Sequence, residues 1–362
     1  MNTEDPQTEA QQAKDAEILK AINDEWQMFT PRYSKFLSQV FLPMGLAMAD
    51  IIEAGEGDTI LEVGCGDGSF TAELCLLKKP SAKLYAVDLV NNMCRVTYVK
   101  LAKLAALVNE PKGIINYKKK LAEASAPVLE AGDETNDFGA VSRREVPELN
   151  AEVIKANSEF LQEVIPDASV DKYISSLVLQ IVVSPERMIK EAYRVLKPGG
   201  RAVFSVWGQE TDGYVFTEIT RLMYDSGKLT GERKKKGSWL LNDRKKTIGM
   251  LEEQGFKNVI AWDHWNTWHV LTEEDVVDLV ENFYCPAVRL NTTGEQFEYI
   301  KAGLLEKFRH VVLEQKKPAS RVFFHDYCRP EVRRSDIWDK MQELLSIKST
   351  LSTFCFNFRL EI

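Results

Sequence analysis

One short stretch of the chain, residues 59–70, places a carboxylate directly before a glycine-rich turn. It starts with β-branched and apolar residues, apart from Glu62, which predicts a buried strand. Three glycines at alternate positions then let the backbone turn sharply and let a ligand approach without meeting a Cβ atom. A helix predicted from Ser69 would point its free N–H groups at that ligand. The three glycines are Gly64, Gly66 and Gly68.

A buried carboxylate such as Glu62 is costly unless a group of opposite charge pairs with it. An ammonium group on a ligand above the turn would do so. A second carboxylate, Asp88, closes the apolar stretch Leu84–Asp88, about 20 positions after the last glycine of the turn. A carboxylate at the tip of the second strand suits the hydroxyl pair of a ribose. The turn departs from the dinucleotide pattern G-x-G-x-x-G, because Ser69 stands where the last glycine belongs.

Two further stretches complete a set of four motifs. Residues 170–180 read V-D-K-Y-I-S-S-L-V-L-Q, and residues 191–208 contain R-V-L-K-P-G-G followed by an apolar strand. Together with the glycine turn and Asp88, they make the sequence resemble the class I S-adenosylmethionine-dependent methyltransferases. The likeness covers about residues 20–208, and the R-V-L-K-P-G-G stretch resembles the small-molecule branch, which includes quinone and sterol methyltransferases.

The resemblance implies S-adenosylmethionine as the cofactor, with its methionine part at the glycine turn and its ribose hydroxyls on Asp88. It implies an adenine contact at Asn157, where the family often has an acidic residue; the side-chain oxygen of Asn157 can accept the same hydrogen bond. Trp207 and Tyr33 are expected to line the acceptor pocket, although Tyr33 would equally serve on the packing face of a helix. The expected cofactor-binding residues are Tyr33, Glu62, Gly64, Cys65, Gly66, Gly68, Asp88, Leu89, Asn157, Ser158 and Ser175.

The same resemblance implies an α/β fold, with a doubly wound, mostly parallel seven-stranded sheet, an antiparallel last strand and helical cap insertions. Residues 1–54 are expected to form a tail and a helical segment over the cleft, 55–208 the Rossmann-like core, and 209–362 the helical cap and the last two strands. Residues 109–150 are interpreted as an insertion in the core, because they are polar, mixed in charge and poor in aromatics. We expect a surface arm that is dispensable for folding, with a partner-binding arm as the alternative.

Composition limits the partners of the chain. Hydrophobic residues make up 44% and charged residues 28%, which is ordinary for a soluble globular protein with a sizeable core. The net charge of −8 argues against a nucleic-acid partner. No apolar run is long enough to cross a bilayer, and the acidic, polar start of the chain has no signal region. The six cysteines are scattered without a C-x-x-C pair, so we expect reduced thiols, no metal site and a cytoplasmic enzyme.

The chemistry that the resemblance implies is an in-line methyl transfer, for which positioning and desolvation supply much of the acceleration. No Asn/Asp-Pro-Pro-Tyr/Phe sequence occurs, which favours an oxygen or carbon acceptor on a small molecule. If a general base is needed, the candidates are His269 and His325, although a packed or surface histidine is the more usual interpretation of each. Two alternatives stay open: a protein or RNA methyltransferase that docks through the basic clusters 233–236 and 244–246, and a non-catalytic scaffold that keeps the fold. The intact glycine turn counts against the scaffold.

Overall fold

The computed structural model describes residues 9–108, 110, 138–139, 142–208, 214–230, 241–267, 272–278, 293–309 and 352–361. The chain forms two compact units. The first unit consists of Met1–Val206, Arg244–Ile260 and Phe358–Ile362, and the second of Trp207–Asp243 and Ala261–Asn357. Every residue that we expect to bind the cofactor lies in the first unit.

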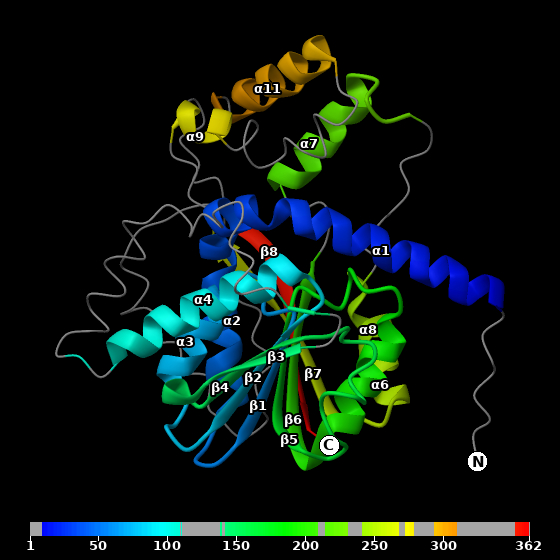
Figure 1. The fold of residues 1–362 in the computed structure, drawn as a ribbon. Coiled ribbons are helices and arrows are strands. Elements are labelled where there is room, and N and C mark those ends of the chain that lie inside the picture. The colour runs from blue at the N-terminus through cyan, green and yellow to red at the C-terminus, as the bar shows by residue number, and fades with distance from the viewer. Residues whose placement is uncertain are drawn as a thin grey trace, which may run out of the picture. The chain divides into compact units, whose positions relative to one another are not determined.

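The described strands form an eight-stranded sheet in the order β3-β4-β2-β1-β5-β6-β8-β7 (Figure 1). The neighbours from β4 to β6 are parallel, whereas β3 pairs antiparallel with β4. The predicted α/β fold with a mostly parallel sheet is therefore confirmed, but the sheet has eight strands and not seven. The last strand, β8, lies between β6 and β7. The bounds are β1 Thr59–Val63, β2 Lys83–Asp88, β3 Ser142–Val146, β4 Ala151–Lys155, β5 Val170–Ser176, β6 Leu196–Trp207, β7 Lys257–Thr267 and β8 Ser352–Glu361.

Helices cover both faces of the sheet, as in a doubly wound fold, with α2, α3 and α4 on one face and α6 and α8 on the other (Figure 1). The sequence at residues 184–185 explains where α6 begins. The Ser184 hydroxyl caps α6 by accepting the Arg187 N–H at 3.2 Å, and Pro185 takes the first helical position. The helical bounds are α1 Glu9–Arg32, η1 Tyr33–Leu37, α2 Ser38–Ile52, α3 Ser69–Leu77, α4 Asn91–Val108, η3 Pro147–Leu149, α6 Pro185–Val195, α7 Tyr214–Asp225, α8 Arg244–Glu253, α9 Glu273–Asp278 and α11 Gly294–Phe308.

The N-terminal helical segment contains two prolines. Proline normally interrupts a helix, but Pro31 and Pro43 both lie inside helices. The backbone instead passes from α1 to α2 through a π-helix, η1, which begins directly after the turn that holds Pro31. A widened turn of this kind is a usual response to a disrupted helical ladder, and it occurs frequently at functional sites. Here it carries Tyr33.

Polar contacts fix α1 to the rest of the first unit. The backbone N–H of Asn92 donates to the Gln27 side chain at 3.1 Å, and the Asn92 amide donates to the Gln27 carbonyl at 3.1 Å. Farther along α1, Asp15 pairs with Arg187 at 2.9 Å. Arg187 also pairs with Glu159 at 3.0 Å, and the Glu159 side chain is fully buried. These contacts tie α1 to the start of α4 and to α6.

The interpretation of residues 109–150 as a surface arm is wrong at its C-terminal end, which belongs to the sheet. Residues 142–146 form β3, which pairs along its whole length with β4. Arg143 on this strand pairs with the buried Glu152 at 3.1 Å. The charged sequence of β3 hides a strand because an edge strand exposes one side to water and tolerates such residues. Among the described residues of this segment, the side chains that enter the core are Phe138, Val146 and Leu149.

The second unit contains α7, α9 and α11 among its described residues. Gly303 lets α7 and α11 approach closely, because a Cβ atom there would lie 2.4 Å from Leu222. The Gln296 side chain donates to the Ser226 carbonyl at 3.1 Å and joins the same two helices. Arg309 pairs with Glu273 at 2.6 Å, which joins α11 to the start of α9.

Among the described residues, no single helix has both the length and the apolar content to cross a bilayer. One pair of segments bent by 90°, Glu9–Lys35 with Val40–Ile52, meets that criterion by length and composition only.

Phe138 tests directly whether residues 138–150 belong to the core. Its ring packs edge-on against Tyr98, with centroids 6.5 Å apart, and the Arg144 guanidinium lies 5.1 Å from its centroid. We expect Phe138→Ala to lower the free energy of unfolding by about 3–5 kcal/mol, the usual cost of removing a buried aromatic ring. Urea denaturation measures this change.

The matched control is Phe160→Ala, because the Phe160 side chain is 53% exposed and the Arg187 guanidinium lies 5.4 Å from its ring centroid. This variant should change the free energy of unfolding by less than about 1 kcal/mol. Equal stability of the two variants would show that Phe138 lies on a dispensable arm after all.

Candidate functional site

The glycine turn joins β1 to α3 as the sequence predicts. Gly64, Gly66 and Gly68 have φ angles of 69°, 57° and 74°, which other residues adopt only with strain. Two of them also lack room for a side chain. A Cβ atom on Gly64 would lie 2.1 Å from Val178, and one on Gly68 would lie 2.8 Å from the Thr97 backbone. Backbone conformation and packing therefore both require glycine.

Most backbone N–H groups of the turn donate hydrogen bonds to other groups of the protein. The donors and acceptors are Gly64 and Cys65 to the Val87 carbonyl (2.7 and 3.0 Å), Gly66 to Asp88 (2.9 Å), Gly68 to the Cys65 carbonyl (3.0 Å) and Ser69 to Asp67 (3.1 Å). The prediction that α3 presents free N–H groups to a ligand is therefore wrong at Ser69. A phosphate approaching this helix start would meet the Asp67 carboxylate in place of a free Ser69 N–H group.

Glu62 lies at the end of β1 and is buried. Its Oε2 oxygen has no hydrogen-bond partner among the described residues. Burial raises the pKa of Glu62 to about 8, and the negative charges of Asp88 and Asp67 act in the same direction, against the Thr71 hydroxyl. A buried carboxyl oxygen without a partner is rare and calls for an explanation. A cationic group of a ligand would supply both the missing donor and the missing charge.

Asp88 ends β2 and binds the turn. Its Oδ2 oxygen accepts the Gly66 N–H at 2.9 Å, and its Oδ1 oxygen accepts the Val90 N–H at 2.9 Å. Burial raises the pKa of Asp88 to about 6, although these N–H groups favour the ionised form. A carboxylate offers more acceptor positions than these two bonds use. Asp88 can therefore hold the turn and still accept hydrogen bonds from a diol.

The sequence reasoning missed a buried ion pair beside the turn. Lys100, on α4, places its Nζ atom 2.9 Å from Asp67 Oδ2, and the two side chains are 4% and 3% exposed. Lys100 also donates to the Ser69 hydroxyl at 2.7 Å, and that hydroxyl donates to Asp67 at 3.0 Å. The only signal in the sequence is that Lys100 shares an otherwise apolar helical face with Leu101 and Leu104.

The π-helix η1 places Tyr33 against the turn. A Cβ atom on Gly66 would lie 3.3 Å from Tyr33 Cε1 and 3.6 Å from its hydroxyl oxygen. Burial and the carboxylates of Asp67, Asp88 and Glu62 raise the pKa of the Tyr33 hydroxyl well above its usual range. Tyr33 therefore lies at the turn and also serves in helix packing. Its aromatic neighbours are Trp26, Phe29 and Phe41, with centroids 5.9, 6.5 and 6.4 Å away.

Other expected cofactor residues follow β4 and β5. The Asn157 side-chain oxygen accepts the Glu159 N–H at 3.0 Å, which uses one of the acceptor positions expected for adenine. Ser158 is buried, and the fully buried Ser175 has a hydroxyl without a hydrogen-bond partner among the described residues. After Ser175 the chain is strained, because Leu177 has a φ of 60°. Strain at the carboxyl edge of a parallel sheet is typical of a ligand-binding position.

The remaining candidate residues differ in their burial and in whether the structure describes them. Cys65 is buried, with its sulfur 3.7 Å from the Thr97 hydroxyl, and Leu89 is half-buried directly after Asp88. Trp207 is buried at the end of β6. The basic residues 244–246 begin α8. The candidate bases His269 and His325 and the basic cluster 233–236 lie outside the described residues.

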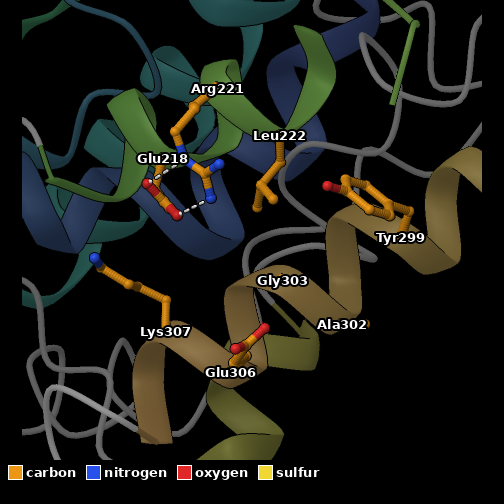
Figure 2. Close-up of a pocket in the computed structure, with 8 residues that line it drawn as sticks. All are labelled: Glu218, Arg221, Leu222, Tyr299, Ala302, Gly303, Glu306 and Lys307. Atoms are coloured by element: carbon orange, nitrogen blue, oxygen red, sulfur yellow. Dashed lines mark hydrogen bonds and ion pairs between the residues drawn. The ribbon is translucent and has the colours of Figure 1, made fainter. Parts of the chain in front are cut away.

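The second unit holds a separate cavity of about 660 Å³ between α7 and α11 (Figure 2). Arg221 and Glu218 form a two-bonded ion pair at its α7 side, with N–O distances of 3.0 and 2.6 Å. The charges of Arg221 and Glu218 therefore balance one another in the cavity wall. None of the site residues predicted from the sequence lines this cavity. The lining residues are Glu218, Arg221, Leu222, Tyr299, Ala302, Gly303, Glu306 and Lys307.

Comparison with known proteins gives partial matches. A family model described as a methyltransferase domain matches residues 131–204. An uncharacterised protein of Methanocaldococcus jannaschii, MJ1123, is 32% identical over 115 residues, 32% of this chain and 49% of that protein. The ubiquinone/menaquinone biosynthesis C-methyltransferase UbiE of Pasteurella multocida is 27% identical over 146 residues, 40% of this chain and 38% of that enzyme. The structure of phosphoethanolamine N-methyltransferase 2 of Haemonchus contortus aligns with 92% of this chain and 57% of its own, at 12% identity and a TM-score of 0.42.

The chain spans less than half the length of these two relatives. The family match includes β3, β4 and β5 and begins after the glycine turn. The sequence matches confirm the predicted resemblance: this chain is similar to class I S-adenosylmethionine-dependent methyltransferases and, among them, to the quinone methyltransferases.

Gly68 tests whether the turn depends on close packing as well as on its backbone conformation. Gly57 is a matched control, since its φ of 73° is nearly that of Gly68, but a Cβ atom there would meet nothing within 4 Å. Gly57→Ala should cost about 1–2 kcal/mol, the strain of a left-handed backbone. Gly68→Ala should cost about 1–3 kcal/mol more, because the added Cβ atom overlaps the Thr97 backbone. Urea denaturation compares the two variants, and equal losses would contradict the packing argument.

Proposed function

We propose that this chain is an S-adenosylmethionine-dependent methyltransferase that transfers a methyl group in line to an oxygen or carbon atom of a small molecule. The observation that carries the proposal is the pair of buried carboxylates, Glu62 and Asp88, at a glycine turn where Asp67 covers the helix start. The matches to a methyltransferase domain and to a quinone C-methyltransferase support the same class.

The groups around the turn fit a cationic ligand that carries a ribose. Glu62 would bind an ammonium group, because its Oε2 oxygen has no partner among the described residues. Asp88 would accept the ribose hydroxyls, and the Tyr33 ring would cover the ligand at Gly66. When bound, the cofactor supplies an electrophilic methyl group on a positively charged sulfur. The protein's part is to hold it in a site from which water is excluded, where fixed charges act strongly.

The same geometry disfavours a dinucleotide. A pyrophosphate binds at a helix start whose N–H groups are free, but here the Ser69 N–H already donates to the Asp67 carboxylate at 3.1 Å. Lys100 already neutralises Asp67, and Glu62 holds a proton at pH 7, so the occupied N–H group, and not charge repulsion, disfavours the pyrophosphate.

The small-molecule acceptor is the finer part of the proposal. The relative from Pasteurella multocida is named a C-methyltransferase of quinone biosynthesis, which supports a flat, apolar acceptor. Trp207 and Tyr33 are the aromatic side chains that we expect to line its pocket, as is usual for such ligands. A general base is needed only if the acceptor must lose a proton, and His269 and His325 are the candidates.

Methylation of a protein or an RNA is the alternative. The net charge of −8 argues against RNA, while the basic residues 244–246 at the start of α8 would be its docking surface. A homocysteine-release assay with a small-molecule extract, run beside assays with total protein and total RNA, separates these acceptors. Turnover with the protein or RNA fraction alone would overturn the small-molecule proposal, and no turnover with any fraction would favour a scaffold.

Calorimetric titration tests the cofactor. We expect the protein to bind S-adenosylmethionine and its demethylated product, and to bind the dinucleotide NAD more weakly. Asp88→Ala should weaken cofactor binding by about 1.5–3 kcal/mol, which is typical of hydrogen bonds to a charged group and corresponds to about tenfold or more in Kd. No binding of S-adenosylmethionine, or tighter binding of NAD, would contradict the proposal.

The raised pKa of Glu62, about 8, predicts that cofactor affinity depends on pH. At pH 7 the free protein holds a proton on Glu62, whereas an ammonium ligand binds the ionised carboxylate. Binding must then release this proton, so affinity should fall about tenfold for each pH unit between about pH 7.5 and pH 6, below which Asp88, with a pKa of about 6, also gains a proton. Titrations in two buffers of different ionisation enthalpy measure the released proton directly.

Glu62→Gln should abolish both the proton release and this pH dependence, while the exposed-site control Glu163→Gln should keep them. The free protein gives a second readout. Because the folded-state pKa of Glu62 lies above its unfolded value of about 4.3, the folded chain binds more protons between these values, and the stability contributed by Glu62 falls as pH rises through that range. The stability of Glu62→Gln relative to the wild type should therefore increase from about pH 5 to pH 8, and a constant difference would contradict the assignment.

A further inference from the structure

We propose that Lys100 is a positioning residue for the cofactor: through Asp67 it holds the glycine turn in the conformation that receives the ligand. This inference rests on the proposed function. It adds a residue that no motif of the turn contains, located 33 positions after Asp67 on another helix.

The ion pair lies at the hinge between the turn and α3. Asp67 Oδ1 accepts the first N–H of α3, from Ser69, at 3.1 Å, and Oδ2 accepts Lys100 at 2.9 Å. Gly68 occupies the N-cap position of α3 and has no side chain with which to cap it. Asp67 therefore takes over the capping of α3, and Lys100 fixes the direction of that carboxylate.

Two other residues on the same face of α4 bind neighbouring backbone groups. The Thr97 hydroxyl donates to the Gly66 carbonyl at 2.8 Å, and the Cys94 thiol donates to the Asp88 carbonyl at 3.5 Å. Cys94, Thr97 and Lys100 are spaced three residues apart, so they lie along one ridge of the helix surface that is inclined to the helix axis. One face of α4 thus contacts β2, the middle of the turn and the start of α3 in succession.

Lys100 also sets the charge that a ligand meets. Among the described residues it is the one cation that pairs with any of the buried carboxylates Glu62, Asp67 and Asp88. It neutralises Asp67, which lies at the helix start, and leaves Glu62 and Asp88 for ligand groups. A buried charge that loses its partner is strongly destabilising, so removal of Lys100 should displace Asp67 and the N–H groups that it holds.

The test compares three variants by calorimetric titration with S-adenosylmethionine and by thermal unfolding. Lys100→Met removes the cation. Lys78→Met is the matched control, because Lys78 is also buried, follows the other end of α3 and donates to the Ala82 carbonyl at 2.7 Å. The neutral pair, Asp67→Asn with Lys100→Met, removes both charges and so leaves no unpaired charge buried.

We expect Lys100→Met to weaken S-adenosylmethionine binding at least tenfold, and Lys78→Met to stay within about twofold of the wild type. The neutral pair should unfold at a higher temperature than Lys100→Met, because no unpaired charge is buried. It should still bind S-adenosylmethionine at least tenfold more weakly than the wild type, because the Lys100 side chain no longer holds the turn against α4. Wild-type affinity in Lys100→Met, or its recovery in the neutral pair, would overturn the proposal and leave Lys100 with charge balance alone. If Lys100→Met does not fold, the neutral pair decides the question.

Hydrogen exchange of the free protein gives a readout that does not need the cofactor. The amides of residues 64–69 should exchange at least tenfold faster in the neutral pair than in the wild type, while the amides of β5 keep their rates. Unchanged exchange in the turn would overturn the inference even if the wild type binds S-adenosylmethionine. Failure of the wild type to bind S-adenosylmethionine, together with faster exchange in the variant, would instead contradict the proposed function alone.

Discussion

The first unit is organised by the cost of burying negative charge. Glu62, Asp67 and Asp88 all lie within the glycine turn or at the ends of the strands that flank it, and all three are buried. The protein satisfies each one differently. Asp67 has a cation, Asp88 has backbone N–H donors, and Glu62 retains a proton because its pKa is about 8. Asp67 therefore has a structural role, Asp88 both holds the turn and can bind a ligand, and Glu62 is left for a ligand.

This arrangement explains how the turn can keep a fixed conformation and still bind a ligand. Its backbone N–H groups bond to neighbouring protein groups, so the loop keeps its shape before any ligand arrives. A site formed in advance loses little freedom when it binds, and its charges need not reorient. The groups that the turn leaves for a ligand are then side chains, above all Glu62 and Tyr33, and less the helix start than in phosphate-binding loops of similar sequence.

Much of the fold and of the candidate site could be predicted because the information is local. The glycines, Glu62 and Asp88 each lie in or beside a strand whose apolar pattern is plain, and parallel strands bring their carboxyl ends to one edge. The pair of Asp67 and Lys100 could not be predicted, since the two residues meet only when α4 packs against the turn and a lysine on a helix normally reaches water. The strand β3 was hidden for a related reason: Arg143, Arg144 and Glu145 read as solvent-exposed residues until β4 pairs with them.

The position of β3 has a consequence for how the protein behaves in a crowded solution. Without it, β4 would end the sheet, and its sequence A-E-V-I-K contains the buried pair Val153 and Ile154. An apolar terminal strand with open backbone groups is a template for pairing with other chains. β3 covers that edge with a short strand that carries Arg143, Arg144 and Glu145, and charged side chains on an edge strand disfavour pairing with other chains. We therefore expect the residues that look least structural in the sequence to lower the tendency of the sheet to aggregate.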